Sequence, residues 1–411
     1  MRLTAALLVL ALVFSGTVNA MPERFFRPGD PLNANDINNI VDALLHQITG
    51  GKGIQVRTFG DRLIVSKDAR AKAPLAKKWE VVFYPVNWGK NTTFVLYFNG
   101  NLWAGVNGDK WFASPTGAEG SWEYVTGPPI LSSMIDAIVF NGYMYVGGTD
   151  RTRPPDFLPE SAIYRSSDGT TWTEVWRDTR TIARDNPWHF AVHNSVLYMF
   201  AHTSGTWAEN NVYSTPDGTT WTLLGDCIPA TSTYSSSPSI KAVSDGTYIY
   251  VTFHYRIGAS EYHYVIRRST NGVSWASVLD ITLSATPINS GGGLDYKDGV
   301  FLAGMYEGFY TSEDGTTWTL DPDTSLEKGI TIITSDGRWR AFAYNTTPKS
   351  KRAGSAPWTD DALGDGLGGG LGITNLYCQP FEYNGYVYQA THIGDGVTRK
   401  KLGMQVPASG G

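Results

Sequence analysis

One short motif recurs four times in the chain, and this repetition constrains the fold more than any other feature. It consists of a hydroxyl residue, an acidic or amide residue two positions later, a glycine directly after it and a tryptophan three residues further on. The copies begin at Ser166, Thr215, Ser269 and Ser312. Their acidic or amide positions are 49, 54 and 43 residues apart (168 to 217, 217 to 271, 271 to 314). A self-similar period of this length indicates an array of repeats or a β-propeller.

The composition agrees with a fold made of strands and turns. The 411 residues include 45 glycines, 14 tryptophans and 22 tyrosines, and only 17% are charged. This is typical of an all-β protein with aromatic packing. The net charge of -5 argues against nucleic acid as a main partner. The two cysteines, Cys227 and Cys378, imply no disulfide framework. No CxxC or clustered His/Cys spacing suggests a metal, so we expect neither a metal nor a cofactor.

Residues 1–20 have the features of a secretory signal. Arg2 precedes an apolar run over residues 5–14, and residues 18–20 are small, as at a cleavage site. The run is short for a membrane span, so we expect none in the mature chain. The alternative is that Met21 is the true start.

A helix-plus-hairpin module is predicted over residues 21–66. The apolar positions of its helix recur at helical spacing: Ile37, Ile40, Val41, Leu44, Leu45 and Ile48. Asn33 is a suitable N-cap, and Gly50 and Gly51 end the helix. Residues 53–57 and 62–65 alternate around a turn at 59–61, which predicts a small hairpin. So small a unit cannot bury the apolar stripe alone. It must dock on the propeller, on copies of itself or on another protein.

The sequence of this module resembles the opening segment of many bacteriophage tail and virion structural proteins. The resemblance covers residues 28–66 and rests on LNANDIN at 32–38, the helix, and GKGIQV at 51–56. It implies a module that attaches the chain to a virus particle. A generic capping helix is the alternative. Residues 67–78, rich in Lys and Ala, are predicted to be a linker.

The rest of the chain is predicted to fold as repeats of four short strands. An Asn-Gly, Asp-Gly or Asn-Ser pair lies between the first two strands of each repeat, at 99–100, 141–142, 194–195, 245–246, 298–299, 336–337 and 384–385. Such pairs favour tight hairpins, because the turn needs positive φ. The second turn, which carries the motif, is degenerate at 114–122 and reduced to Pro357-Trp358 in the sixth repeat. Seven first hairpins predict a seven-bladed β-propeller, with a six-bladed ring as the alternative.

The seventh repeat has no fourth strand of its own. Trp79-Glu80-Val81, directly after the linker, matches the segments that begin at Trp122 and Trp172. We therefore expect residues 79–86 to supply the missing strand and to close the ring, so that no sheet edge stays open. The propeller then spans residues 79–405, and 406–411 form a tail.

The motif resembles the Asp box, or bacterial neuraminidase repeat, of the sialidase-like propeller superfamily, although one residue between Asp and Gly is missing. The carboxylate accepts backbone N–H bonds within the turn, and glycine takes a φ that other residues avoid. Tryptophan fills the gap between blades. Asn271 favours a structural role, because an amide cannot perform acid–base chemistry. This role is assigned to Asp168, Trp172, Asp217, Trp221, Asn271, Trp275, Asp314 and Trp318.

The long connections are predicted to lie on one face, opposite the Asp turns, at 150–160, 177–189, 203–210, 227–238 and 257–261. Loops on a rigid scaffold often carry binding residues. The candidate ligand-binding residues are Arg151, Arg184, Trp188, His202, Trp207, His254, Arg256 and His392. Arginine forks suit carboxylates and aromatic faces suit sugar rings, which indicates a glycan ligand. The alternative is that these are ordinary loop residues and strand ends. The histidines need not converge on a metal, since separate blades hold them.

No residue can be assigned a catalytic role. The sialidase resemblance implies an arginine triad, a Tyr/Glu nucleophile pair and an acidic proton donor. The early Arg-Ile-Pro string is absent, Arg256-Ile257-Gly258 is the nearest match, and Tyr306-Glu307 has only the right residue types.

The sequence therefore favours a non-catalytic, virion-associated propeller of the tail or fibre type. It would bind a cell-surface carbohydrate or a partner subunit, and a virion protein would hold residues 21–66. A homo-oligomer is compatible with the sequence. The alternative is a secreted, exo-sialidase-like glycoside hydrolase or lyase. The expected location is the virion, or the extracellular space if the signal is real.

Overall fold

A computed structural model describes most of the region from residue 80 to residue 402 and one hairpin before it. The described residues are 54–59, 62–67, 80–83, 92–106, 110–128, 133–150, 160–180, 185–203, 210–229, 234–258, 261–283, 292–305, 308–322, 329–343, 348–352, 357–360, 380–390 and 397–402. They contain strands and turns and no helix. The chain divides into two compact units, Met1–Pro74 and Leu75–Gly411. The predicted helix and signal lie outside the described residues, as does the predicted linker apart from Lys67, which is the last residue of a strand.

The first unit contains one antiparallel hairpin, formed by β1 (Ile54–Phe59) and β2 (Arg62–Lys67). The second unit contains seven four-stranded antiparallel sheets, which we number as blades 1–7 in chain order. Blade 1 consists of β4 (Thr92–Phe98), β5 (Asn101–Val106), β6 (Lys110–Ser114) and β7 (Glu123–Thr126). Blade 2 consists of β8 (Ser133–Phe140), β9 (Tyr143–Asp150), β10 (Glu160–Ser166) and β11 (Thr173–Asp178). Blade 3 consists of β12 (Asp185–His193), β13 (Val196–Thr203), β14 (Asn210–Thr215) and β15 (Thr222–Asp226).

The remaining blades follow the same order. Blade 4 consists of β16 (Tyr234–Ser244), β17 (Ile249–Ile257), β18 (Glu261–Ser269) and β19 (Ala276–Thr282). Blade 5 consists of β20 (Gly293–Lys297), β21 (Val300–Met305), β22 (Gly308–Ser312) and β23 (Thr319–Leu320). Blade 6 consists of β24 (Gly329–Thr334), β25 (Arg338–Ala343), β26 (Lys349–Arg352) and β27 (Thr359–Asp360). The predicted seven-bladed propeller is confirmed. The six-bladed alternative is wrong, because the degenerate sixth repeat forms its own sheet.

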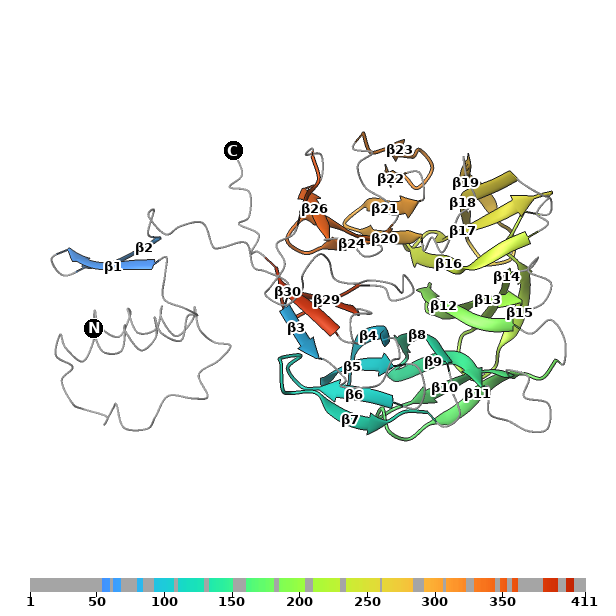
Figure 1. The fold of residues 1–411 in the computed structure, drawn as a ribbon, viewed down its shortest axis with the longest axis horizontal. Helices are drawn as coiled ribbons and strands as arrows, with labels where there is room; N and C mark the ends of the chain where they lie inside the picture. Colours follow the sequence, from blue (N-terminus) through green and yellow to red (C-terminus); the bar gives the residue numbers. More distant parts are fainter. Residues whose placement is uncertain are drawn as a thin grey trace. The chain divides into compact units, whose positions relative to one another are not determined.

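Blade 7 joins the two ends of the propeller sequence. It consists of β28 (Phe381–Tyr383), β29 (Tyr386–Ala390), β30 (Val397–Lys401) and, from far upstream, β3 (Glu80–Phe83). Figure 1 shows red β30 beside blue β3, and Glu80 pairs with Arg399. Val82 of β3 is buried in the layer between blades 7 and 1. The described part of this strand is shorter than the 79–86 expected from the sequence.

The first hairpins fall into two classes. Five of them have an Asn or Asp at positive φ at the predicted position, for example Asn141 at 47°. Asp245 and Asp336 belong to longer turns, in which the positive φ falls on the following glycines, Gly246 at 89° and Gly337 at 71°. A dipeptide signal thus locates the turn correctly but does not by itself fix its length.

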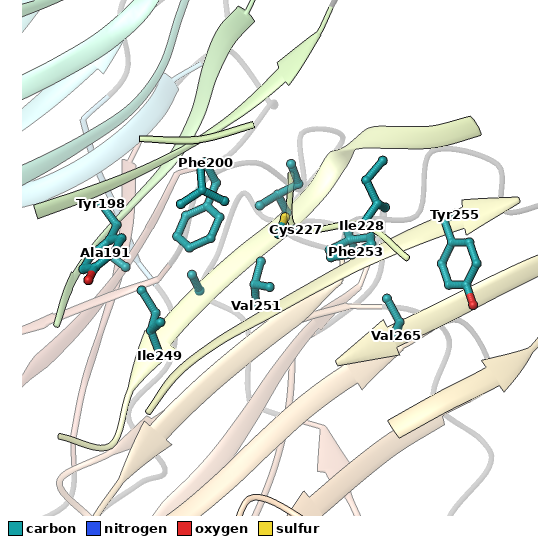
Figure 2. Packing of buried hydrophobic residues seen from close by; sticks show 13 residues of the cluster. Ala191, Tyr198, Phe200, Cys227, Ile228, Ile249, Val251, Phe253, Tyr255 and Val265 are labelled. Atoms are coloured by element: carbon teal, nitrogen blue, oxygen red, sulfur yellow. The ribbon is translucent and has the colours of Figure 1, made fainter. Parts of the chain in front are cut away.

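Apolar layers between adjacent blades form the core. The layer between blades 3 and 4 contains Phe200, Val212, Val251 and Phe253, all with no exposed surface. Figure 2 shows Phe200, Val251 and Phe253 gathered between the sheets, with buried Cys227 among them. The motif tryptophans lie at the edges of such layers. Trp172, Trp221, Trp275 and Trp318 each pack against a different one.

The four motif turns share one hydrogen-bond pattern. Asp168 Oδ1 accepts from the backbone N–H groups of Thr170 and Thr171, at 2.7 Å each, and from Ser166 Oγ at 2.9 Å. The Gly169 N–H donates to Ser166 Oγ at 2.8 Å. The same acceptor role is taken by Asp217, Asn271 and Asp314 in their turns. Because these N–H bonds favour the ionised form, they hold the pKa of the three aspartates far below its usual range.

Each turn glycine also touches the preceding blade. Gly218 of blade 3 lies against the ring of Tyr145 on β9, so closely that a Cβ at this position would clash with the phenol. The same contact joins Gly117 to Tyr388, Gly169 to Trp103, Gly272 to Tyr198 and Gly315 to Tyr250. The turn is therefore a contact between blades as well as a local structure.

The antiparallel order assigns two faces to the propeller. The first hairpins and the motif turns share one face, which we call the turn face. The connections between second and third strands, and those between blades, reach the other face, which we call the loop face. Successive first strands contact one another from β4 to β24, and β28 contacts β4, around a central channel. No helix in the described part of the chain is long and apolar enough to cross a membrane.

Candidate functional site

The structure describes four of the eight candidate ligand residues. Trp188 lies on β12 and His202 on β13, both in blade 3, whereas His254 and Arg256 lie on β17 in blade 4. The other four, Arg151, Arg184, Trp207 and His392, lie outside the described residues.

The two described histidines are deeply buried. His202 is 2% exposed and His254 3% exposed, and burial lowers the pKa of each to about 4. Both imidazoles are therefore neutral at physiological pH. The Trp188 ring meets the His202 ring edge-on at 6.5 Å, and the Arg256 guanidinium lies 5.9 Å from the Tyr262 ring centre. These contacts and the burial of His254 give the four residues packing roles in the sheets, and their contact with a ligand stays a prediction.

A buried carboxylate, Asp185, organises the loop face of blade 3. It is the first residue of β12 and has no exposed surface. Its Oδ1 accepts from Thr203 Oγ1 at 2.6 Å and from Asn211 Nδ2 at 3.1 Å. Its Oδ2 accepts from Tyr213 Oη at 2.6 Å and from Asn211 Nδ2 at 3.0 Å. Three strands, β12, β13 and β14, thus meet at one side chain.

An arginine joins this carboxylate to blade 2. Arg180 Nη2 lies 2.7 Å from Asp185 Oδ2 and 2.6 Å from Asp178 Oδ2. Asp178 also accepts from the backbone N–H of Arg180 at 2.9 Å and of Asp185 at 2.6 Å. Burial raises the pKa of Asp178, but the hydrogen bonds from Arg180 and the N–H of Asp185 outweigh it, so the net pKa is lowered. We call Asp178, Arg180, Asp185, Thr203, Asn211 and Tyr213 the loop anchor.

The loop anchor connects the ends of two candidate loops. Arg180 and Asp185 flank residues 181–184, and Thr203 and Asn210 flank residues 204–209. The Asp185 carboxylate accepts hydrogen bonds from Thr203 and from Asn211, which directly follows Asn210 in the chain. The segments that carry Arg184 and Trp207 therefore start and end at one hydrogen-bonded cluster.

The chemistry of the loop anchor favours a structural role over a catalytic one. Burial raises the pKa of Tyr213, and its hydrogen bond to Asp185 raises it further, far above its usual range. A tyrosine nucleophile needs the opposite shift. Tyr213 is therefore a protonated donor.

A second polar cluster supports the loop face of blade 4. His263 lies between two carboxylates, with Nδ1 2.8 Å from Asp280 Oδ1 and Nε2 3.0 Å from Glu261 Oε1. Tyr255 stacks on the imidazole at 4.9 Å and donates to Asp280 Oδ2 at 2.7 Å. Burial raises the pKa of Tyr255 far above its usual range, and the bond to Asp280 adds to this. Among the described residues, no group of His, Cys, Asp or Glu has a metal-binding arrangement.

Sequence reasoning missed both clusters. The available signal was a set of polar residues at strand ends, namely Asp178, Asp185 and Asn211, where apolar alternation would be expected. That signal marks a polar site, but it does not reveal which strand ends meet.

The comparisons with known proteins concern the fold. The sequence matches no protein-family model and no curated protein. YCF48 from Cyanidioschyzon merolae is 13% identical, with a TM-score of 0.52 over 79% of this chain and 98% of that chain. YCF48 bound to D1 peptide is 12% identical, with a TM-score of 0.51 over 81% of this chain and 100% of that chain. The extracellular domain of the hybrid two component system BT4673 from B. thetaiotaomicron is 12% identical, with a TM-score of 0.54 over 80% of this chain but 40% of that chain. At these identities the likeness establishes the β-propeller fold that the three share with this chain.

Proposed function

We propose that the chain is a non-catalytic β-propeller whose loop face binds a carbohydrate of a cell surface, and that residues 21–66 attach it to a virus particle. The observation that carries the binding role is the loop anchor. Asp185 fixes the ends of two loops whose residues include Arg184 and Trp207. A ligand-binding loop gains affinity when its ends are fixed in advance, because less conformational freedom is lost on binding.

The residue types on these loops support a sugar ligand. Tryptophan offers an apolar face for a pyranose ring, and arginine donates several hydrogen bonds to hydroxyl or carboxylate oxygens. The loop anchor at the ends of these loops carries two carboxylates and one guanidinium. This excess of acid opposes a strongly anionic ligand, so a neutral or weakly acidic glycan is the better match.

The protonation state of the anchor supports binding without turnover. Tyr213 contacts an acid beside an arginine, and these are the residue types of a sialidase centre. Its raised pKa keeps the phenol neutral. The buried Asp185 is engaged by four side chains, so its oxygens are occupied within the loop anchor.

A glycan array with the full-length protein tests the proposal. We expect saturable binding to a subset of glycans, and a loss of at least tenfold in affinity for Arg184→Ala and for Trp207→Ala. Arg268→Ala is the matched control, because it removes the same charge from β18 close to the turn face. A silent array, or unchanged binding by both loop variants, would overturn the carbohydrate role. Hydrolysis of a fluorogenic sialoside by the wild-type protein would overturn the non-catalytic role.

The attachment role is tested separately. The division of the chain at residue 74 supports a module that acts apart from the propeller. We expect a chain that starts at Leu75 to retain β3, to fold and to bind glycan, but to be missing from purified particles. Incorporation of this shortened chain at the full-length level would contradict an attachment role for the N-terminal module.

A further inference from the structure

A cavity lies inside the ring of first strands, away from the loop anchor. Its volume is about 440 Å³, and β4, β8, β12, β16, β20 and residues 380–381 line it. The lining reaches the ends of β8 and β12 at the turn face, where Val139 is 39% exposed and Val192 36% exposed. The cavity therefore opens to solvent on the turn face. Its volume lies within the range of small-molecule sites, roughly 300–1,000 Å³.

The cavity wall is largely apolar. Leu96, Ile138, Leu294 and Phe381 contribute to it from four different blades. Tyr97, at the same level, stacks on Tyr383 with ring centres 4.1 Å apart. Such a wall favours a ligand with a hydrocarbon or aromatic body.

Two carboxyl groups also line the cavity, and one of them already has a histidine and a lysine as side-chain neighbours. Asp136 Oδ2 lies 2.8 Å from His189 Nδ1 and accepts from the Phe190 N–H at 2.9 Å. Burial raises the pKa of Asp136, but His189, and then the charge of Lys241, lower it below its usual value. This carboxylate is therefore ionised, and the charge of Lys241 helps to compensate it within the protein.

Among the described residues, the other carboxyl, Asp295, accepts hydrogen bonds from two backbone N–H groups and from no side chain. Its Oδ2 accepts from the Ile333 N–H at 2.5 Å, and its Oδ1 from the Tyr296 N–H at 3.0 Å. In the described part of the chain it forms no ion pair, and the neighbouring Lys297 pairs with Glu382 at 2.9 Å. A carboxylate has about four acceptor positions, so two remain for a ligand. Burial raises the pKa of Asp295 to about 6, although the two backbone hydrogen bonds and the charge of Lys297 act to lower it.

We propose that this channel cavity binds a small organic ammonium ion, whose nitrogen pairs with the Asp295 carboxylate and whose apolar body packs on the channel wall. An ionised carboxylate in an apolar cavity is unfavourable until a cation compensates it. An ammonium ion supplies the charge and hydrogen-bond donors, and its hydrocarbon part replaces water at the wall. The site lies toward the turn face, so it can succeed or fail independently of the glycan site.

Calorimetric titration of the full-length protein with butylamine, benzylamine and tryptamine at pH 7.5 tests the proposal. We expect saturable binding of at least one amine and at least tenfold weaker binding of benzyl alcohol than of benzylamine. Because only the ionised carboxylate pairs with the cation, affinity falls about tenfold per pH unit below pH 6. Asp295→Asn weakens amine binding by at least tenfold, and Val139→Trp, which fills the mouth of the cavity, abolishes it.

Asp298→Asn is the matched control. It removes the same charge three residues away, from an exposed turn position where Asn99, Asn141, Asn194 and Asn384 occupy the equivalent sites. We expect it to bind amines like the wild type. Absence of saturable binding for all three amines overturns the proposal. Equal binding of benzyl alcohol, or unchanged binding by Asp295→Asn, overturns the role of Asp295.

Discussion

Replacing Asp185 by Asn tests whether one carboxylate holds the loop face together. The side chain keeps its volume but loses its charge, and one acceptor oxygen becomes an NH₂ donor. The hydrogen bonds from Thr203, Asn211 and Tyr213 then lose charge assistance, which is worth about 1 kcal/mol each. The ion pair with Arg180 is also lost, but that guanidinium is 42% exposed, so its contribution is small. Because the cost of burying the carboxylate disappears as well, we expect a net loss of about 2–4 kcal/mol.

Urea unfolding followed by tryptophan fluorescence measures this loss. All 14 tryptophans lie after residue 74, so the signal reports the propeller unit alone. Glu123→Gln, at an exposed position of β7, is the control and should change the free energy of unfolding by less than about 0.5 kcal/mol. Tyr213→Phe combined with Asp185→Asn should be non-additive by about 1 kcal/mol, since both changes remove the same bond.

A loss no larger than that of Glu123→Gln would refute the reasoning, because the anchor would then contribute nothing to stability. Full additivity of the Asp185 and Tyr213 variants would refute the assigned bond. The glycan array links this measurement to function. If the loop anchor positions the loops, Asp185→Asn weakens glycan binding in the absence of urea, where the propeller stays folded.

Three further predictions concern the ring itself. Gly218→Ala should lower the free energy of urea unfolding by about 2–5 kcal/mol, because its φ is 74° and a Cβ would clash with Tyr145. Gly142→Ala, at a φ of 76° with open space around it, should lower it by only about 1–2 kcal/mol. Equal losses would contradict the contact between blades. The buried His254 is protonated more easily in the unfolded chain, so its contribution to folding stability is present above pH 6.5 and is lost as the pH falls to about 4. His254→Gln should remove about 3 kcal/mol of this loss of stability in acid. An unchanged pH profile would contradict the burial of His254. The pH dependence of stability due to Asp295 has the opposite sign, because the folded chain holds the proton of this carboxyl more tightly than the unfolded chain does. As the pH rises from 4 to 6.5, the wild type should lose about 3 kcal/mol of stability relative to Asp295→Asn. A constant difference in stability between the two proteins would show that the carboxyl is not desolvated.

The ring could be predicted from the sequence because its signals are local. Asn141-Gly142 and its counterparts mark hairpins within a few residues, and the resemblance of the segment at Trp79 to the other tryptophan-led strands identifies the closing strand. The turn length at Asp245 could not be read in this way. It depends on the pairing of Ser244 with Ile249, which the dipeptide does not encode.

The candidate site was much harder to predict, because its parts meet only through sheet register. Asp178, Asp185 and Tyr213 belong to three strands in two blades, and nothing in their spacing indicates that they touch. His202 and His254 show the reverse problem. Their positions at strand exits suggested a ligand role, whereas sheet pairing and neighbouring blades bury both rings.

The contact between turn glycine and aromatic ring explains where the motif is absent. The third residue after the first hairpin turn is aromatic in blades 1, 2, 3 and 7, and in blade 4 the longer turn shifts it by one position, to Tyr250. Each of these rings packs on a turn glycine of the following blade. In blade 5 this position is Leu302, which packs with Trp358 in blade 6, where the motif is reduced. In blade 6 this position is Arg340, which is buried in an ion pair with Asp336. Blade 7 has no turn between its third and fourth strands on which a ring from blade 6 could pack, because its fourth strand, β3, comes from upstream. The aromatic ring and the turn glycine therefore form one contact between blades. The motif is lost where a smaller side chain replaces the ring or where the chain topology removes the turn.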